Sequence, residues 1–508
     1  MIERIAKFKN ITPIVKSSLI LGILTVAVKV LGYSEKLALA YYFGTSYEID
    51  VYNVVIAITF SVFILFREVI EPGFLNVFIR GFYQGDRAGS WQLFRIFFIL
   101  ISVLTIGFTA VCFIFPAQVV YIFAPGFSQE KTNLAASMLK IIIPATIFLS
   151  LSALTNISLN ALKRFALPTL GEIASKILIL AFLFVFYNTL GIYSVAIGFL
   201  VGAFIKLIFH LVVMYKHIVV KTSDYISSYL RETWRLTWPL LIGVAFSQVG
   251  TLIDNVFASY QREGAISALN YARKLVDLPI LVFPYILSVV IFPYFSELSI
   301  AKEKGKLTVL LSKALAWITV VFLPLSLFYF MFSHELTSIV FQRGAFDEQS
   351  TSLTSLPLKY YSVGMVFFAI ETVLVIFYFA NSDTKTPIFI GIISVIENIL
   401  LTVLFIHLLG YSGIALSLVV SKATKNIILL VLLRKMIVVN FRKAFTFVLK
   451  VIAAFSLTAF GMTLLKNNHP YLEDIYASKF LYVTLMFLIC TVFYAIGVML
   501  FKIKRELF

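Results

Sequence analysis

The 508-residue chain is 60% hydrophobic and only 13% charged, which excludes a soluble globular protein because such a protein could not cover so much apolar surface. Its net charge of +17 would suit a nucleic-acid-binding protein, but the cations alternate between successive loops and therefore follow membrane topology. The two cysteines, Cys112 and Cys490, lie in apolar runs, so we expect neither a disulfide nor a metal ligand.

Apolar stretches long enough to cross a bilayer recur from Val15 to Lys502, and no long polar segment resembles a soluble domain. The basic amino terminus has no small-residue cleavage pattern after its apolar run, so we expect a retained first span. The sequence predicts an all-α polytopic membrane protein of about fourteen helices. In chain order the predicted spans are about 16–42, 50–79, 92–115, 133–160, 165–188, 191–215, 236–260, 265–297, 308–332, 352–380, 387–408, 411–433, 445–465 and 479–501.

Lysine and arginine are distributed unequally over the loops between these spans. One alternating set of loops, which includes both termini, holds 26 of them. The other set holds 5, namely Lys131, Arg262, Arg343, Lys466 and Lys479. The positive-inside rule therefore places both termini in the cytoplasm and accounts for most of the net charge without nucleic acid.

The sequence repeats itself at an offset of 219 residues. Matching positions include Pro168 and Pro387, Gly191 and Gly410, Lys206 and Lys425, and Glu35 and Asp254. The repeat predicts a six-helix bundle at 1–216, a second at 217–435, and two additional helices at 436–508. Because six is even, both bundles enter the membrane in the same sense, as in transporters with a central cavity. Channels and passive scaffolds also contain duplicated bundles, so they remain alternatives.

Ionisable residues inside the spans are costly in hydrocarbon and usually face a cavity or a partner. We interpret the first two helices of each half as the lining of a cationic cavity for an anionic headgroup. Arg67 and Glu71 are four residues apart and can pair, and Glu35 and Asp254 are candidates for binding a coupling cation. The candidate substrate-binding residues are Lys29, Lys36, Arg67, Glu71, Arg273 and Lys274, and the candidate coupling or structural acids are Glu35, Asp50 and Asp254.

Internal ion pairing and snorkelling toward the interface are the alternative explanation for these charges. We favour that explanation for Lys140, Lys206, Lys359 and Lys425, which we expect to stabilise packing or to reach the membrane surface. The five histidines fall in no catalytic motif, and no nucleotide-binding loop is present, so we expect no enzyme and no cofactor. Energy would come from Na⁺, from H⁺ or from the membrane potential.

Seven segments carry a family pattern: VLGYSEKLALAYYFGTSYEIDVYNVV, FREVIEPGF, FAPGFSQEK, SLSALTNISLNALKRFALP, SQVGTLIDNVFASYQREGAISALNYARKLVDLP, VFQRGAFDEQST and FYFANSDTKTP. In this order, from about Val30 to Lys435, they resemble the MurJ (MviN) family of lipid II flippases. The resemblance implies the superfamily that also includes polysaccharide flippases and multidrug exporters. It further implies a cavity between the halves, a groove for a polyprenyl tail beside the last two helices, and alternating access in the bacterial cytoplasmic membrane.

The resemblance implies cavity arginines in the first, second and eighth spans, but this chain departs from that pattern. Lysine stands at Lys29 and Lys274, Glu35-Lys36 inverts the usual charge order, and Arg67 alone remains of a double arginine. A lysine retains the charge but loses bidentate geometry toward pyrophosphate. Asp50 and Glu71 match the family's acids.

We therefore expect a monomeric flippase for lipid II, the undecaprenyl-pyrophosphate-linked peptidoglycan precursor, with membrane lipids and cell-wall synthesis proteins as partners. A flippase for another polyprenyl-linked oligosaccharide and a cation-coupled small-molecule exporter of the same superfamily remain alternatives. A scaffold without transport and a membrane-embedded transferase belong to other classes, and the transferase would require a catalytic acid-base pair that we do not find.

Overall fold

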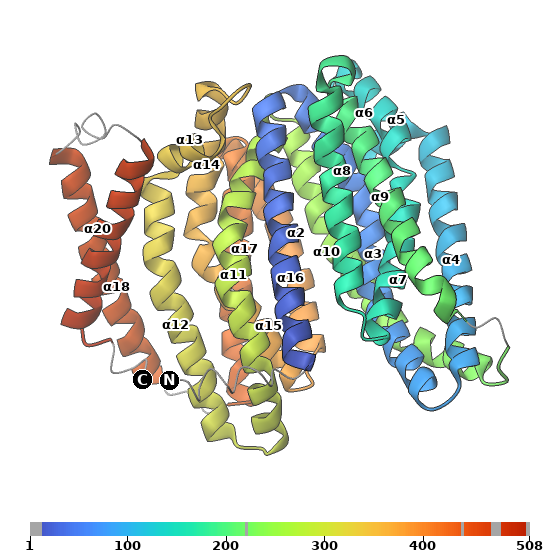
Figure 1. The fold of residues 1–508 in the computed structure, drawn as a ribbon. Helices are drawn as coiled ribbons and strands as arrows, with labels where there is room; N and C mark the ends of the chain where they lie inside the picture. Colours follow the sequence, from blue (N-terminus) through green and yellow to red (C-terminus); the bar gives the residue numbers. More distant parts are fainter. Residues whose placement is uncertain (1–12, 219–221, 438–440, 469–478, 504–508) are drawn as a thin grey trace, which may run out of the picture. The chain divides into compact units, whose positions relative to one another are not determined.

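A computed structural model describes residues 13–218, 222–437, 441–468 and 479–503 of the chain (Figure 1). Over these ranges the regular structure is helical, and no residue in them is assigned to a strand. The basic residues of the amino terminus, together with Lys221, Lys504 and Arg505, lie outside the described residues. The predicted all-α fold is confirmed.

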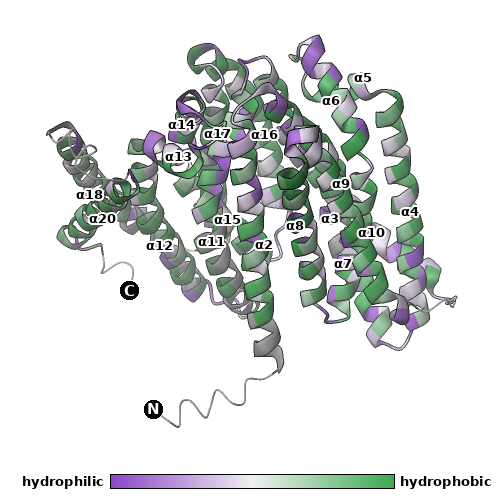
Figure 2. Ribbon diagram, turned by 45° about the horizontal axis from the view of Figure 1, so that its top comes forward, coloured by the Kyte–Doolittle hydropathy of each residue, from purple (hydrophilic) through white to green (hydrophobic). Residues whose placement is uncertain are grey.

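Ten helices in the described ranges are long and apolar enough to cross a membrane, and two bent helix pairs raise the number to 12. Two further helices, α2 and α11, are 31 and 36 residues long but carry several charges. Each predicted span coincides with one of these helices or bent pairs. Apolar residues dominate the helices, while hydrophilic residues concentrate at helix ends and loops (Figure 2).

Contacts group the chain into two compact units, Met1–Tyr260 and Gln261–Phe508, called the first and second unit below. The first unit contains α2 (Pro13–Phe43), α3 (Tyr47–Tyr83), α4 (Arg87–Ile114), α5 (Pro116–Phe123), α6 (Gln129–Ile142), α7 (Ala145–Ala161), α8 (Ala166–Leu190), α9 (Tyr193–Met214), the 3₁₀ turn η2 (Tyr215–His217) and α10 (Ile226–Ser259).

The second unit begins with α11 (Ala265–Ile300) and ends with the pair α18 and α20, both of which pack against α12. Its elements are α11, α12 (Lys304–Met331), α13 (Ser333–Phe341), α14 (Glu348–Val363), α15 (Met365–Ala380), α16 (Lys385–Leu409), α17 (Ser412–Leu432), the 3₁₀ turn η3 (Leu433–Lys435), α18 (Phe441–Asn468) and α20 (Lys479–Leu500).

Helix α10 corresponds by sequence to the start of the second repeat half, but it packs against α3, α4 and α5 of the first unit. Glycines permit this close approach: a Cβ on Gly73 of α3 would lie 2.1 Å from Thr237 Oγ1, and one on Gly126 would lie 2.6 Å from the Ser259 backbone. The domain boundaries at residues 216 and 435 describe a sequence repeat, which grouping by contacts does not test, so they stay a prediction.

Backbone features recur at the repeat offset. Gly191 and Gly410 end α8 and α16 with φ of 53° and 59°, which a β-carbon would disfavour. Lys163 and Ser382 also have positive φ, at 61° and 60°. The bent pairs α6–α7 and α14–α15, with bends of 42° and 49°, occupy equivalent positions as well. The two bundles therefore share one local design, including the short helices α5 and α13, which sequence analysis missed.

Aromatic side chains form much of the core within each unit. In the first unit, Trp91 of α4 is fully buried and meets Phe78 of α3 edge-on, with ring centroids 5.5 Å apart. In the second unit, Phe328 of α12 and Phe332, which directly follows this helix, pack with Met486 of α20. This packing fixes the helices that carry the charged side chains described next.

Candidate functional site

Two cations of the first unit are exposed on the long helices α2 and α3. Lys29 lies exposed on α2. Arg67 lies on α3, with 47% of its side chain exposed, and its Nη2 is 2.6 Å from Glu68 Oε1. The guanidinium also lies 5.5 Å from the centre of the Phe63 ring. A half-exposed ion pair within a spanning segment indicates contact with a polar environment rather than with lipid tails.

Arg67 has a partner that helical spacing did not indicate. The structure pairs it with its neighbour Glu68, 48% exposed, while the pairing with Glu71 stays a prediction. The side chain of Glu71 lies outside those that the structure describes. Adjacent residues point in different directions on a helix, so long side chains must bend toward one another to make this pair.

Glu35 is held inside the first unit. It is 4% exposed, with Oε2 2.7 Å from Lys176 Nζ on α8 and Oε1 3.8 Å from Lys36 Nζ. The Lys36 ammonium also lies 6.0 Å from the Tyr52 ring centre. Two ammonium groups thus neutralise this carboxylate, and a coupling cation at Glu35 would have to displace them.

The other two predicted acids are also placed in polar surroundings. Asp50, near the start of α3, is 2% exposed, and Asp254 on α10 is half-buried. Both take part in polar or electrostatic interactions. Asp50 stands in the first turn of α3, where the positive end of the helix dipole stabilises a negative charge.

In the second unit, Arg273 and Lys274 share one carboxylate. Arg273 Nε lies 2.9 Å from Asp277 Oδ1, and Lys274 Nζ lies 3.8 Å from Asp277 Oδ2. The Arg273 guanidinium is 4.2 Å from the Phe368 ring centre and 5.6 Å from that of Tyr361. Lys274 is more accessible, with 47% of its side chain exposed.

Arg273 and Lys274 differ in how firmly their charged groups are held. Arg273 is stacked and paired, which favours a rigid position, while Lys274 extends its ammonium outward. Sequence reasoning did not identify the aromatic partners Tyr361 and Phe368, because they belong to other helices and the motif gives no indication of them. Asp277, four residues after Arg273, was detectable from helical spacing.

Internal ion pairs account for the lysines that we expected to be structural. Lys425 and Lys422 on α17 lie 2.6 and 3.0 Å from Glu371 Oε1 on α15. Lys206 on α9 pairs with Glu172 on α8. The other two lysines of this set, Lys140 and Lys359, are exposed, and the Lys359 ammonium lies 4.9 Å from the Phe330 ring centre.

An ion pair and several hydrogen bonds hold α10 in place at one end of the first unit. Arg80 on α3 binds Glu232 on α10 through both guanidinium nitrogens, with Nη1 2.7 Å from Oε1. Ser223 donates to Asp86 Oδ2 at 2.6 Å. Burial alone would raise the pKa of Asp86, but hydrogen bonds, chiefly from Ser223 and Gly89, outweigh that effect and lower it.

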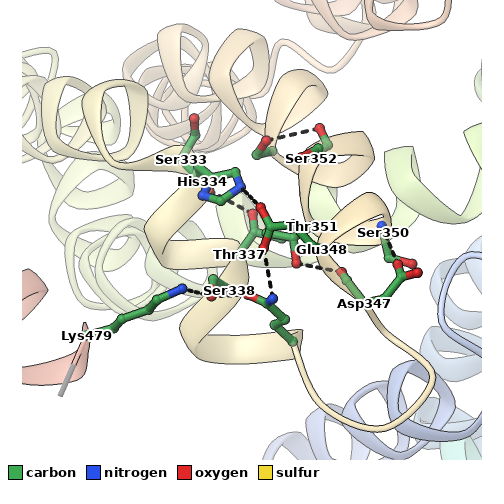
Figure 3. A network of polar contacts seen from close by, with 12 residues as sticks. Ser333, His334, Thr337, Ser338, Asp347, Glu348, Ser350, Thr351, Ser352 and Lys479 are labelled. Carbon is green, nitrogen blue, oxygen red and sulfur yellow. Dashed lines mark hydrogen bonds and ion pairs between the residues drawn. The ribbon is translucent and has the colours of Figure 1, made fainter. Parts of the chain in front are cut away.

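A second polar network connects α13, α14 and α20 in the second unit (Figure 3). His334 Nε2 lies 2.8 Å from Glu348 Oε1, and Lys479 points toward Ser338, with Nζ 3.5 Å from Oγ. Lys466 of α18 lies 3.1 Å from Glu335 Oε1. The last turn of α18 and the first residue of α20 are therefore both attached to α13.

Asp347 begins α14 and accepts a hydrogen bond from the Ser350 backbone N–H at 2.8 Å. This bond holds the pKa of Asp347 below its usual value. In the first unit Ser128, at the equivalent repeat position, caps α6 through Lys131 N–H. The two N-caps are a local feature that both bundles share.

The accessible cations among these groups favour binding of an anion. The described residues contain no cluster of three or more His, Cys, Asp or Glu side chains that could hold a metal ion. Cys112 and Cys490 are both buried thiols. Arg67 and Lys274 are instead accessible cations on spanning helices, where a phosphate group would be attracted strongly.

Residues 39–487 match the family model described as lipid II flippase MurJ. The chain belongs to the MurJ family. A probable lipid II flippase MurJ of Buchnera aphidicola subsp. Schizaphis graminum is 28% identical over 415 residues, which make up 80% of each chain. The match extends into α20, beyond the segments that carried the resemblance.

Solved structures show that this chain has the MurJ fold. A lipid II flippase MurJ in an inward closed conformation aligns with a TM-score of 0.79 and 24% identity, over 95% of this chain and 98% of that one. An inward-facing multidrug resistance MATE family transporter of the MOP superfamily aligns with a TM-score of 0.68 and 13% identity, over 80% and 94%. The MurJ fold is thus shared with multidrug transporters, and residues within it must decide the substrate.

Proposed function

We propose that this MurJ family member moves lipid II from the inner to the outer leaflet of the bacterial cytoplasmic membrane by alternating access. Family membership supports the substrate class. The observation that carries the assignment is the pair of accessible cations on spanning helices, Arg67 and Lys274, each with 47% of its side chain exposed. The protein would leave its substrate chemically unchanged.

The pyrophosphate is the costly part of lipid II to move, because a multivalent anion loses strong hydration near hydrocarbon. Arg67 lies 20 residues into α3, about 30 Å from its start at the usual helical rise. The apolar span of α3 is Tyr47–Glu68, so Arg67 stands at its far end, where a guanidinium can meet the headgroup as it leaves the membrane surface while the polyprenyl tail stays in lipid. Lys29, Lys36 and Arg273 would add positive potential.

Alanine substitutions at Arg67 and Lys274 test the proposal. Charged hydrogen bonds contribute about 1.5–3 kcal/mol, so each variant should lose about 10- to 150-fold in lipid II transport in liposomes. Neither variant should rescue a strain depleted of its own lipid II flippase, although membrane insertion should be normal. Lys140→Ala and Lys359→Ala remove exposed lysines that we assign to packing or the interface, so both should rescue growth. Rescue by Arg67→Ala and Lys274→Ala as well would contradict the assignment.

Two alternatives concern the substrate. Lysine in place of arginine at Lys29 and Lys274 offers one-point rather than bidentate contacts, which favours tolerance of a different polyprenyl-linked glycan. The structural similarity to a multidrug transporter favours a small-molecule exporter. Parallel transport assays with lipid II, with an undecaprenyl-pyrophosphate oligosaccharide and with a cationic dye separate the three.

We also propose that both termini face the cytoplasm and that the protein acts as a monomer. The unequal loop charges support the orientation. Both native cysteines are buried, so a single introduced cysteine can report topology. In intact cells an impermeant maleimide should label Arg343→Cys and leave Lys302→Cys unlabelled; the opposite labelling would reverse the orientation.

A further inference from the structure

Four exposed side chains of α10 lie on one face of the helix, near its start. They are Arg231, Trp234, Arg235 and Trp238. Their i, i+3, i+4, i+7 spacing places all four within about 100° of one another around the helix axis. The two tryptophans are 65% and 49% exposed, and both arginines are exposed as well. Cations and aromatic rings therefore alternate along this surface, which is called the α10 face below.

Packing within the first unit uses the other side of α10. Thr233 and Thr237 are 0% and 6% exposed, and they lie where α10 contacts α3. Glu232, the acid nearest to the arginines in sequence, binds Arg80 of α3. No ion pair joins either arginine of the α10 face to a carboxylate of the described residues. Both guanidinium groups are therefore available to an anion from outside the chain.

The α10 face lies at the depth of lipid headgroups. Helix α10 ends at Ser259, which follows Trp238 by 21 residues and Arg231 by 28. At the usual helical rise these separations are about 32 and 42 Å. The hydrocarbon core of a bilayer is about 30 Å thick, and about 40–45 Å with its headgroups. A helix that leaves the core near Ser259 therefore carries the α10 face into the opposite headgroup layer, which the proposed orientation assigns to the inner leaflet.

The order of groups along the α10 face fits a polyprenyl-pyrophosphate glycan. From the hydrocarbon outward, an indole, a guanidinium, a second indole and a second guanidinium follow one another. Such a lipid presents its prenyl tail, its pyrophosphate and its sugar rings in that order. A guanidinium binds phosphate oxygens in bidentate fashion, and an indole packs its flat ring against the C–H face of a sugar. An ordinary phospholipid would meet Trp238 and Arg235 but has no sugar for Trp234.

The first repeat half offers a comparison within the same sequence. At the repeat offset, the four positions of the α10 face hold Thr12, Val15, Lys16 and Leu19. The start of the first half therefore has one cation and no aromatic ring. Tryptophan and arginine also anchor spans at membrane interfaces. The first span of the other half does without this alternating pattern, so anchoring alone does not account for it.

We propose that the α10 face docks the headgroup of a polyprenyl-pyrophosphate glycan in the inner leaflet, before the lipid is carried across. Arg235 binds the pyrophosphate, and Trp234 stacks on the sugar next to it. Trp238 contacts the start of the prenyl tail, while Arg231 attracts the carboxylates of the peptide that lipid II carries. This inference rests on the proposed function and specifies where the substrate first binds.

Tryptophan fluorescence reports docking directly. The chain has four tryptophans, and Trp317→Phe leaves the α10 face and the fully buried Trp91 as the emitters. In nanodiscs, lipid II with a nitroxide on its glycan should quench this emission. Unlabelled lipid II should reverse the quenching, and undecaprenyl pyrophosphate should need a mole fraction about 2- to 10-fold higher, because it lacks the sugars. Reversal by phosphatidylglycerol at the mole fraction of lipid II would overturn the assignment, since the face would then bind any lipid phosphate.

Single variants separate the phosphate contact from the sugar contact. Arg235→Gln should weaken binding of lipid II and of undecaprenyl pyrophosphate alike, by about tenfold. Trp234→Leu should weaken binding of lipid II by about 2- to 10-fold and leave undecaprenyl pyrophosphate unchanged. Trp234→Tyr retains an aromatic ring and should bind both lipids nearly as the wild type does. Equal losses for both lipids in Trp234→Leu would contradict the sugar contact and identify this tryptophan as an interfacial anchor.

Transport in liposomes separates this inference from the proposed function. Arg231→Gln with Arg235→Gln should raise the lipid II concentration for half-maximal transport about tenfold and keep the maximal rate. The matched control, Arg164→Gln with Lys216→Gln, removes two exposed cations from other loops of the first unit and should behave as the wild type.

An equal rise in that control would overturn the docking site, because general surface charge would then explain the effect. Transport of lipid II by a wild-type protein whose emission it does not quench would also overturn the docking site, and would leave the proposed function intact. Quenching by lipid II without any transport would overturn the proposed function instead.

Discussion

At the scale of single residues, Asp347 shows how a side chain of ordinary type fixes a helix start. Its carboxylate accepts the Ser350 N–H, which no residue within α14 can bind. The same position of the first repeat half holds Ser128, which caps α6 in the same way. Serine and aspartate are both strong N-cap residues, so the two repeat halves cap the equivalent helix with different side chains.

Asp347→Ala should lower the stability of the protein by about 1 kcal/mol, the usual contribution of an N-cap. Because the folded-state pKa of Asp347 is lowered, its stabilisation is complete above the unfolded value of about 3.9 and is lost as pH falls through the folded value. Thermal unfolding in detergent at pH 7 should show the loss. Asp347→Asn retains an acceptor and is the control; an equal loss in both variants would point to charge rather than capping.

The charged residues show where sequence reasoning reaches its limit. Helical spacing alone puts Asp277 within reach of Arg273, although we had not predicted that pair from the sequence. It could not pair Lys176 with Glu35, which are 141 residues apart in the chain. It also gave no sign that Arg67 contacts Glu68, because spacing says nothing about a flexible side chain that bends to its neighbour.

At the scale of helices, hydrophobicity was sufficient to locate every predicted span. A helix needs about 20 apolar residues to cross the bilayer, and it satisfies all its backbone hydrogen bonds within its own segment. The short helices α5 and α13 escaped detection because 8 or 9 residues are too few to give a clear period. The bends within α6–α7 and α14–α15 also escaped, since each pair reads as one apolar run.

Helix α10 is the element whose place the repeat did not predict. Its residues correspond to α2, yet it is secured to the first unit by the Arg80–Glu232 pair, by Thr237 against Gly73, and by Ser259 Oγ, which accepts the Gly126 N–H at 3.0 Å. Sequence similarity between halves reports common ancestry of elements, while packing depends on which glycines allow contact.

Gly126→Ala should separate α10 from the loop before α6. The new Cβ would lie 2.6 Å from backbone atoms of Ser259 and Tyr260, which cannot rotate away. Overpacking of this kind costs about 1–3 kcal/mol, so the melting temperature should fall. Gly107→Ala is the matched control, because no atom lies within 4 Å of its new Cβ. A fall of equal size in Gly107→Ala would show that the contact with α10 is not the cause.

At the scale of the whole molecule, the two halves solve one electrostatic problem in different ways. Equivalent lysines, Lys206 and Lys425, lie deep in equivalent helices, where an unpaired ammonium is unfavourable. The first half supplies Glu172 from α8, and the second supplies Glu371 from α15. A carboxylate can thus arrive from either neighbouring helix, provided that it reaches the ammonium group.

The position that corresponds to Glu172 is Gly391, and a Cβ built there would lie 3.6 Å from Lys425 Nζ. A glutamate at 391 could therefore reach Lys425 as Glu172 reaches Lys206. We expect Glu371→Gln alone to lower the folded yield, because removing one partner of a buried pair costs about 3–5 kcal/mol. Adding Gly391→Glu should restore most of that yield by returning a carboxylate to Lys425, measured as monodisperse protein after detergent extraction. Adding Gly391→Ala instead supplies the same Cβ without the charge, so recovery in that variant would show that packing, rather than the ion pair, limits the second half.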